Sequence, residues 1–490
     1  MFFKGKTRWY NIIPSDVIVS EIWPNKKVAQ GSEQQTVLNV EYDPTKRGEF
    51  NYSLDLASTL DANRKNNWGG IMRLLSTTAN NLVDENITFI EVWAKVYGDV
   101  RGGKMVIDLG QISEDVIPNG RLDTEDGINP AFPVKNGILN DGEDVGLDGL
   151  TDDQERQKYA ALIAKYSDMR ADPSGDDWQY ASGSNDFSQI NGTEGNGQSE
   201  IGRFPDTEDL NRNGIADLVN SYFEYEVSLD TTGGTTKNPV IVGGGSNGWY
   251  QFRIPLIDYS RKVGEPSFSV VEFLRVWFTG FDQPVLVRIA DFNLVGNQWQ
   301  EARKNDSTFS VTTVNIEDNP EYTSPPGVIR ERDRTRPDQQ IFANEQSLAM
   351  VFHNLPDGES RQAFRFFSFR PLDVFSYRSM KMFVHGDPNL QFTDTTNYDV
   401  ELFFRFGIDT LNYYEYREQV RPGDASNRGW NPLNNIQIEF AEITSVKQAR
   451  DSAGGATLRY QVRNGPPGAT YSVLGNPTLT QVKFIAVGIE

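Results

Sequence analysis

Residues 400–417 contain two runs typical of β-strands, Val400-Glu401-Leu402-Phe403-Phe404-Arg405-Phe406-Gly407 and, five residues later, Tyr413-Tyr414-Glu415-Tyr416-Arg417. Apolar side chains occupy every second position from Val400 to Phe406. This period of two indicates strands that bury one face. Gly and Pro residues, 43 and 24 in number, separate many similar runs along the chain and supply the turns. The sequence therefore predicts a mainly β protein.

The same order of elements occurs earlier in the chain. The earlier pair reads Met105-Val106-Ile107-Asp108-Leu109-Gly110 and Tyr222-Phe223-Glu224-Tyr225-Glu226. An aromatic strand precedes each pair, at residues 89–96 and 380–385. Two related antiparallel β-sandwiches of jelly-roll-like type account for this repeat, because paired sheets let many short alternating strands bury one face each. The alternative is that strand-rich sequences resemble one another through composition alone.

The two copies differ by a long acidic insertion. Five residues separate Gly407 from Tyr413, whereas 111 separate Gly110 from Tyr222. A loop of this length inside a compact domain normally carries function or structure of its own. Residues 111–220 contain 23 acidic and 8 basic side chains, so they hold a net charge of −15 out of −21 for all 490 residues. This acidity argues against nucleic acid as a partner, because phosphate binding requires basic patches.

The repeat suggests four parts of the chain. Residues 1–56 are expected to contribute an N-terminal extension or strand. Residues 57–300 form the first sandwich with its insertion at 111–220, and residues 301–346 form a linker rich in Pro and Arg. Residues 347–490 form the second sandwich. The basic run Arg330–Arg336 in the linker is expected to be an exposed charged segment.

Several classes of chemistry are excluded or disfavoured by composition. There is no Cys, and His353 and His385 are the only histidines, which argues against thiol chemistry, zinc thiolates and a Ser-His-Asp triad. Nucleotide-binding, hydrolase and metalloprotease motifs are missing, and no pair of carboxylates is singled out as a glycosidase site. We therefore expect no enzyme activity. No signal peptide and no apolar run long enough for a membrane helix is found.

Residues 144–155 match much of the twelve-residue calcium loop of an EF-hand. Acidic groups fall at loop positions 1, 5, 9 and 12, and Gly149 occupies the turn at position 6. The candidate ligands are Asp144, Asp148, the Leu150 carbonyl, Asp152 and Glu155. Thr151 and Gln154 form a capping-box pattern, which predicts a short helix after the loop.

A second candidate loop begins at Asp209. Oxygen-bearing side chains stand at positions 1, 3, 5 and 9, with Gly214 at position 6. The candidate ligands are Asp209, Asn211, Asn213 and Asp217. Segments of Asp, Asn and Gly are also ordinary turns, which is the alternative for both loops. Bound Ca²⁺ would neutralise a segment that otherwise repels itself, so metal binding and folding of the insertion would be linked.

Seven motifs keep the order found in one known protein family. They are Asn67–Arg73, Ile107–Asp115, Asp141–Gly149, Gln251–Pro255, Pro325–Glu331, Asn344–Leu348 and Asn412–Tyr416. Together they resemble the SprA/Sov family, the outer-membrane translocon of gliding motility and type IX secretion in Bacteroidota. The resemblance runs from about Lys4 to the C-terminus. The chain is expected to be a soluble fragment of such a protein.

The resemblance implies a non-catalytic structural and interaction region of the channel that moves folded cargo across the outer membrane. The partners it implies are a PorV-like shuttle protein, a plug protein and secreted cargo. A place in the cell envelope, on the extracellular rather than the periplasmic side, is favoured. The alternative is a carbohydrate-binding surface adhesin, because double jelly rolls support both roles. The adhesin would be favoured if its tryptophans were exposed and could stack on sugars, namely Trp68, Trp93, Trp249 and Trp277. Tryptophans on strands more often lie in the core.

Overall fold

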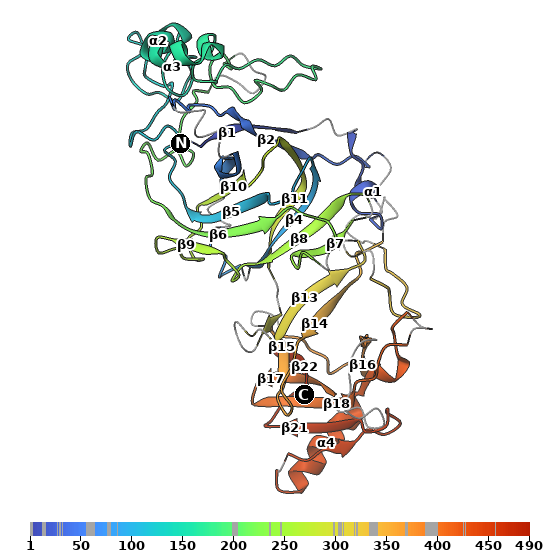
Figure 1. Cartoon of the computed structure of the whole chain (residues 1–490). Coiled ribbons are helices and arrows are strands. Elements are labelled where there is room, and N and C mark those ends of the chain that lie inside the picture. The colour runs from blue at the N-terminus through green and yellow to red at the C-terminus, as the bar shows by residue number, and fades with distance from the viewer. Residues whose placement is uncertain are drawn as a thin grey trace. The chain divides into compact units, whose positions relative to one another are not determined.

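The fold of the 490-residue chain comes from a computed structural model (Figure 1). It describes every residue except 1–2, 12–15, 27, 29–30, 32, 55–63, 76–79, 86, 198–203, 235–236, 246, 297–298, 302–305, 307, 318, 320–321, 333–341, 368–370, 388–399, 425, 427 and 456. The expectation of a mainly β protein is confirmed, and its sheets are antiparallel. The chain divides into two compact units, residues 1–296 and 297–490.

The first unit contains two sheets. One has six strands in the order β1-β2-β11-β4-β8-β7, and the other has five in the order β3-β10-β5-β6-β9. The six strands are β1 (Gly5–Asn11), β2 (Leu38–Arg47), β11 (Val285–Gly296), β4 (Ile87–Tyr97), β8 (Trp249–Pro255) and β7 (Ile241–Gly244). The five are β3 (Trp68–Leu74), β10 (Phe273–Thr279), β5 (Lys104–Gln111), β6 (Ser221–Ser228) and β9 (Arg261–Val263). Short helices α1 (Val19–Ile22) and η3 (Arg64–Asn66) lie in the connections.

One hydrophobic core joins these two sheets. Val40 and Ile90 of the first sheet and Ile107 and Phe278 of the second belong to a single cluster of buried side chains. All four are at most 1% exposed. Because both sheets direct apolar side chains into the same layer, the first unit is a β-sandwich. The residues before position 56 take part in it, since β1 and β2 complete the six-stranded sheet.

The acidic insertion leaves the sandwich at the end of β5 and returns at the start of β6. It contains α2 (Asp152–Lys158), α3 (Ala160–Lys165) and η4 (Ser167–Arg170), drawn in teal in Figure 1. Asn191 of the insertion is hydrogen-bonded to the outer strand β1. The Asn191 side chain accepts the Trp9 N–H at 2.7 Å and donates to the Trp9 carbonyl at 2.8 Å, and it thereby satisfies both polar groups at this point of the open edge.

The second unit contains one large sheet with seven strands in the order β12-β15-β22-β17-β18-β21-β20. These are β12 (Gln300–Glu301), β15 (Arg361–Phe366), β22 (Phe484–Ile489), β17 (Glu401–Asp409), β18 (Asn412–Gln419), β21 (Thr470–Leu474) and β20 (Tyr460–Gln461). Two strand pairs accompany it: β13 (Phe309–Asn315) with β14 (Gln346–Phe352), and β16 (Ser379–Met382) with β19 (Ile436–Glu439). Within the segment expected to be a linker, β13 is thus part of a strand pair, and most of the basic run lies outside the described residues.

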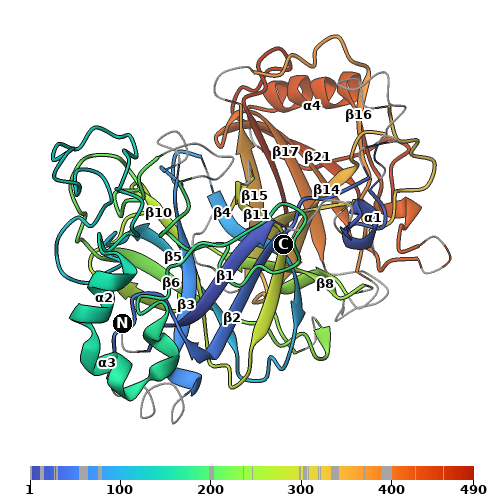
Figure 2. The same ribbon diagram turned by 90° about the horizontal axis from the view of Figure 1, so that it is seen from above.

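A helix packs on the large sheet of the second unit. It is α4 (Phe440–Ser452), which Figure 2 shows beside β21, and η8 (Pro432–Asn434) precedes it. Ile443 and Val446 of α4 share a buried cluster with Phe406 and Tyr471 of the sheet. The sequence analysis did not predict this helix. The second unit therefore uses α4 and the β16–β19 pair to bury the sheet face.

The repeat has a direct structural counterpart. Gly110 of β5 lies opposite Tyr222 of β6, and Gly407 of β17 lies opposite Tyr413 of β18. A Cβ atom on Gly110 would lie 2.3 Å from the Ser221 carbonyl oxygen, and one on Gly407 would lie 2.2 Å from that of Asn412. Both distances are far below van der Waals contact, so each strand pair can close only over a glycine. The two copies thus share the register of this strand pair. The preceding aromatic strand differs: it is β4 of the six-stranded sheet in the first unit and β16 of a two-stranded sheet in the second.

Replacing Gly407 by Ala is expected to lower the free energy of unfolding by about 1–3 kcal/mol, since the added methyl group overpacks the strand pair. Chemical denaturation followed by tryptophan fluorescence measures the change. Gly358→Ala is the control, because a Cβ there meets nothing within 4 Å and only its positive φ of 75° is unfavourable. Equal losses for both variants would contradict a steric requirement at Gly407.

Candidate metal centre

Buried glutamates hold the insertion together. Glu114, Glu125 and Glu143 are fully buried and Glu208 is 2% exposed. Each accepts hydrogen bonds from backbone N–H groups rather than from Lys or Arg. A carboxylate removed from water requires such donors, because an unpaired buried charge is very costly. These four buried carboxylates therefore stabilise the insertion through hydrogen bonds to its backbone.

Three of the buried glutamates connect segments that are far apart in sequence. Glu125 accepts the N–H groups of Gly146 and Asp206, both at 2.9 Å. Glu208 accepts those of Ile117 and Asp123 at 2.8 and 3.0 Å. Burial raises the pKa of Glu125 to about 8 and also raises that of Glu208, while the backbone N–H groups oppose the shift in both.

Glu114 anchors the loop that was the second candidate calcium site. Its two oxygens accept the N–H groups of Leu210, Asn211 and Asp217 at 2.9, 3.2 and 3.3 Å. β5 ends at Gln111 and β6 begins at Ser221. Glu114 therefore joins the first residues of the insertion to its last ones. Burial raises the pKa of Glu114, and the three backbone N–H groups oppose that shift.

A separate group of six carboxylates surrounds the first turn of α2. It consists of three overlapping triplets whose oxygens, one from each residue, lie within 4.8 Å of one another. The triplets are Asp152, Asp177 and Glu194; Asp152, Glu155 and Asp172; and Glu155, Asp176 and Glu194. Glu155 and Asp176 are 0% and 1% exposed. Crowded carboxylate oxygens of this kind suit a hard cation such as Ca²⁺.

The electrostatics of this group are unfavourable for ionised carboxylates. Burial raises the pKa of Asp176 to about 9, with the nearby Glu155 as the next cause. Burial likewise raises the pKa values of Glu155 and Glu194 to about 7 and that of Asp177 to about 6. Without a cation, these side chains resist the charged state at neutral pH, because desolvation and like-charge repulsion act together.

The structure brings together only part of the first predicted loop. Asp152 and Glu155 belong to the carboxylate group, and Asp148 joins its edge through Ser174, whose Oγ donates to Asp148 at 3.2 Å. Asp144 instead accepts the N–H groups of Gly195 and Gly197 at 3.0 and 3.1 Å. The Leu150 N–H donates to Asp148 at 3.0 Å. The expected short helix is present as α2, with the Thr151 N–H bonded to Gln154 Oε1 at 2.9 Å.

The second predicted loop brings its four residues together. Asp209 accepts the N–H groups of Asn213 and Gly214 at 2.9 and 2.7 Å. Asn211 and Asn213 direct their amide NH₂ groups at Asp217, at 2.6 and 3.0 Å, where a cation would require their oxygens instead. Among the described residues, neither Asp209 nor Asp217 belongs to a carboxylate triplet. Internal hydrogen bonds thus satisfy this loop.

Sequence analysis missed four members of the carboxylate group, namely Asp172, Asp176, Asp177 and Glu194. The acidic and glycine-containing run Asp172-Pro173-Ser174-Gly175-Asp176-Asp177 was a local signal. Glu194 offered none, since it reaches the group through a strand-like pairing with Asp177. Glu194 therefore comes close to the other carboxylates only when the chain folds.

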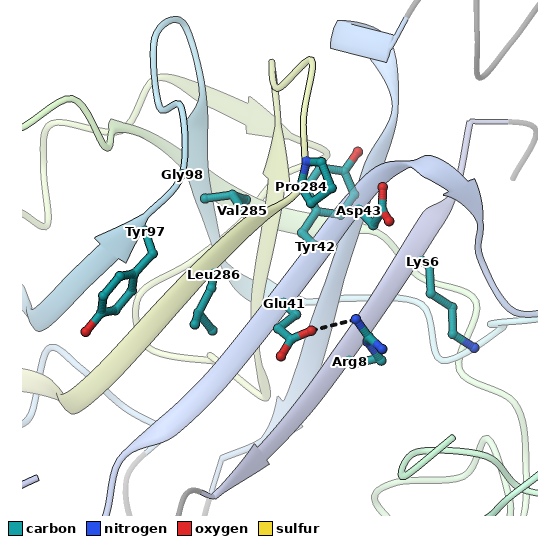
Figure 3. Close-up of a pocket in the computed structure, with 10 residues that line it drawn as sticks. All are labelled: Lys6, Arg8, Glu41, Tyr42, Asp43, Tyr97, Gly98, Pro284, Val285 and Leu286. Carbon is teal, nitrogen blue, oxygen red and sulfur yellow. Dashed lines mark hydrogen bonds and ion pairs between the residues drawn. The ribbon is translucent and has the colours of Figure 1, made fainter. Parts of the chain in front are cut away.

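A shallow pocket on the first unit offers little chemistry. Its lining includes Lys6, Arg8, Glu41, Tyr97 and Leu286 (Figure 3). Both cations are already engaged: Arg8 contacts Glu41 at 2.6 Å, and Lys6 contacts Glu49 at 2.8 Å. Asp43, the remaining charged residue of the lining, accepts the N–H and the hydroxyl of Thr45 at 2.9 and 2.6 Å, so each charged group of the pocket already has a partner.

The aromatic side chains considered for sugar stacking do not form an open platform. Trp93 and Trp249 are each 2% exposed and belong to a buried cluster. Trp68 and Trp277 are half-buried, and the Trp277 indole donates to Asp108 at 2.8 Å. These contacts are those of structural residues. His385 likewise packs edge-on against Trp430, with ring centroids 5.0 Å apart.

Sequence comparison assigns this β-rich architecture to a family. Residues 136–490 match the SprA_N family, described as motility related/secretion protein. The chain belongs to this family, and the resemblance found in the sequence is thereby confirmed. No curated protein matches the chain. In the described part of the chain, no helix has the length and apolar character needed to cross a bilayer.

Glu114→Gln is expected to lower the free energy of unfolding by about 1–3 kcal/mol, because one of the backbone N–H donors would face an amide NH₂ group. Hydrogen exchange at residues 209–217 should report local loosening. Glu226→Gln removes the same charge from an exposed residue paired with Lys104 and should change stability by less than about 1 kcal/mol. Equal protection of the loop in both variants would contradict the anchoring role of Glu114.

Proposed function

We propose that this chain is a non-catalytic structural and interaction region of an outer-membrane protein-secretion translocon, of the type used in type IX secretion and gliding motility. The observation that carries the proposal is the family match across residues 136–490. Two β-rich units suit a structural role, and the charged groups of the pocket described above are already paired. The family membership places the protein in motility or secretion.

The proposed setting is the cell envelope of a bacterium of the Bacteroidota, with the extracellular side favoured over the periplasmic. The proposed partners are a PorV-like shuttle protein, a plug protein and secreted cargo. A net charge of −15 on the insertion supports a role at a surface that contacts proteins rather than nucleic acid. The buried tryptophans do not support the carbohydrate-binding alternative.

We further propose that calcium stabilises the acidic insertion. Two observations support this part: six carboxylates crowd around α2, and desolvation raises the pKa values of four of them. A bound divalent cation would offset both the repulsion and the lost hydration.

Calcium is expected to raise the melting temperature of the metal-free chain, since a ligand bound only to the folded state adds stability. The gain is about 2.7 kcal/mol when free Ca²⁺ is a hundredfold above its Kd. Differential scanning calorimetry in EDTA and then in excess CaCl₂ measures it, and NaCl at the same ionic strength controls for screening. Identical melting curves in EDTA and CaCl₂ would contradict the calcium proposal.

The secretion role predicts that affinity-tagged full-length protein co-purifies with the shuttle and plug proteins from detergent-solubilised outer membranes. Removing the part that contains residues 1–490 should reduce the amounts of these partners and the release of folded cargo. A glycan array provides the opposing readout. Sugar binding without any of the outer-membrane partners would favour an adhesin and contradict the translocon role.

A further inference from the structure

The most unusual part of the carboxylate group is its buried triplet of Glu155, Asp176 and Glu194. Glu155 projects from α2, Asp176 follows the turn at Gly175, and Glu194 lies on a strand-like segment. One oxygen of each carboxylate lies within 4.8 Å of the other two. In the described residues, no Lys or Arg forms an ion pair with any of the three. Three acidic side chains thus converge without a protein cation.

Asp176 gives independent evidence of a missing partner. It is 1% exposed, and its Oδ1 atom is buried without a hydrogen bond. Its other oxygen accepts only the Thr193 hydroxyl, at 2.9 Å. Asp152, a member of the other two triplets, also has an Oδ1 atom without a partner, while its Oδ2 forms an ion pair with Arg156 at 3.2 Å. Buried polar atoms in native proteins are normally paired, and a cation among these carboxylates would pair both oxygens.

We propose that Ca²⁺ binds at the Glu155–Asp176–Glu194 triplet, with Asp152 as a further ligand. Calcium takes six to eight oxygen ligands at 2.3–2.6 Å, and two oxygens on opposite sides of one ion then lie about 4.6–5.2 Å apart. The three oxygens, which lie within 4.8 Å of one another, are therefore close enough to ligate one calcium ion together. This site shares Glu155 and Asp152 with the predicted EF-hand loop, but its other ligands come from outside that loop.

The ligand set favours calcium over other biological metals. All the side chains are carboxylates, which suit hard cations rather than zinc or copper. Magnesium requires near-ideal octahedral geometry at 2.0–2.1 Å and usually keeps several waters, so it is less able to draw in three or more carboxylates. An ion at this place would join α2, the segment around Asp176 and the segment around Glu194. It would thereby cross-link the middle of the insertion.

This inference deepens the calcium part of the proposed function and is independent of the secretion role. Its test is isothermal titration of CaCl₂ into the metal-free 490-residue chain. The decisive variant is Asp176→Asn, which keeps the shape of the side chain and can still accept the Thr193 hydroxyl. We expect its calcium affinity to fall by about tenfold or more, since even outer-shell changes cost metal sites 10–100-fold.

Two matched variants separate this site from charge effects and from the second loop. Asp126→Asn removes the same charge from a buried carboxylate of the insertion, which accepts the N–H groups of Asn136 and Gly137 at 2.9 and 2.7 Å. Asp209→Asn alters the other predicted loop. Both should bind calcium within about threefold of the unaltered chain. Circular dichroism checks folding, and Glu194→Gln replaces Asp176→Asn if that variant does not fold.

Unchanged affinity in Asp176→Asn, or in its substitute Glu194→Gln, would overturn the proposed site. Loss of binding in Asp209→Asn with retention in Asp176→Asn would also overturn it, while leaving calcium stabilisation of the insertion intact. Absence of calcium binding to the unaltered chain would overturn both the site and calcium stabilisation. None of these outcomes bears on the secretion role, because that role is tested separately by co-purification with outer-membrane partners.

Discussion

The insertion depends on one interaction, the hydrogen bond from a backbone N–H group to a buried carboxylate. Few apolar side chains are buried in residues 111–220, among them Leu139, Leu147 and Leu162, so hydrophobic burial is limited there. Hydrogen bonds to buried glutamates stabilise the insertion instead, because they join segments that are distant in the sequence. The glutamates are Glu114, Glu125, Glu143 and Glu208. Such a bond is stronger than a neutral one when the carboxylate is ionised. The acidity of the insertion is therefore partly structural.

The same chemistry explains why the carboxylate group around α2 stands apart. The four structural glutamates have two or more N–H donors each, whereas Asp176 has one hydroxyl partner and an unpaired oxygen. Asp176 therefore differs from the four glutamates in how its charge would be compensated. That contrast, more than the number of acidic residues, is the reason for proposing a cation at this group.

The β framework gives the insertion a fixed base. β5 and β6 are held in register where Gly110 faces Tyr222, so the two ends of a 110-residue segment leave the sheet side by side. The equivalent pair in the second unit, Gly407 and Tyr413, is joined by a tight turn. One framework thus carries a short connection in one copy and a metal-binding candidate in the other.

The β class, the long acidic segment and the family were predictable from the sequence, because alternation, charge and motif order can be read without the fold. It also indicated Asp152, Glu155 and the short helix after them. By contrast, the hydrogen bonds of Asp144 to residues 195–197 and the meeting of Asp176 and Glu194 with Glu155 were not predictable. Neither was the packing of α4 on the sheet of the second unit. These features depend on segments meeting across many residues, and the hydrogen bonds and burial that select them exist only once the chain has folded.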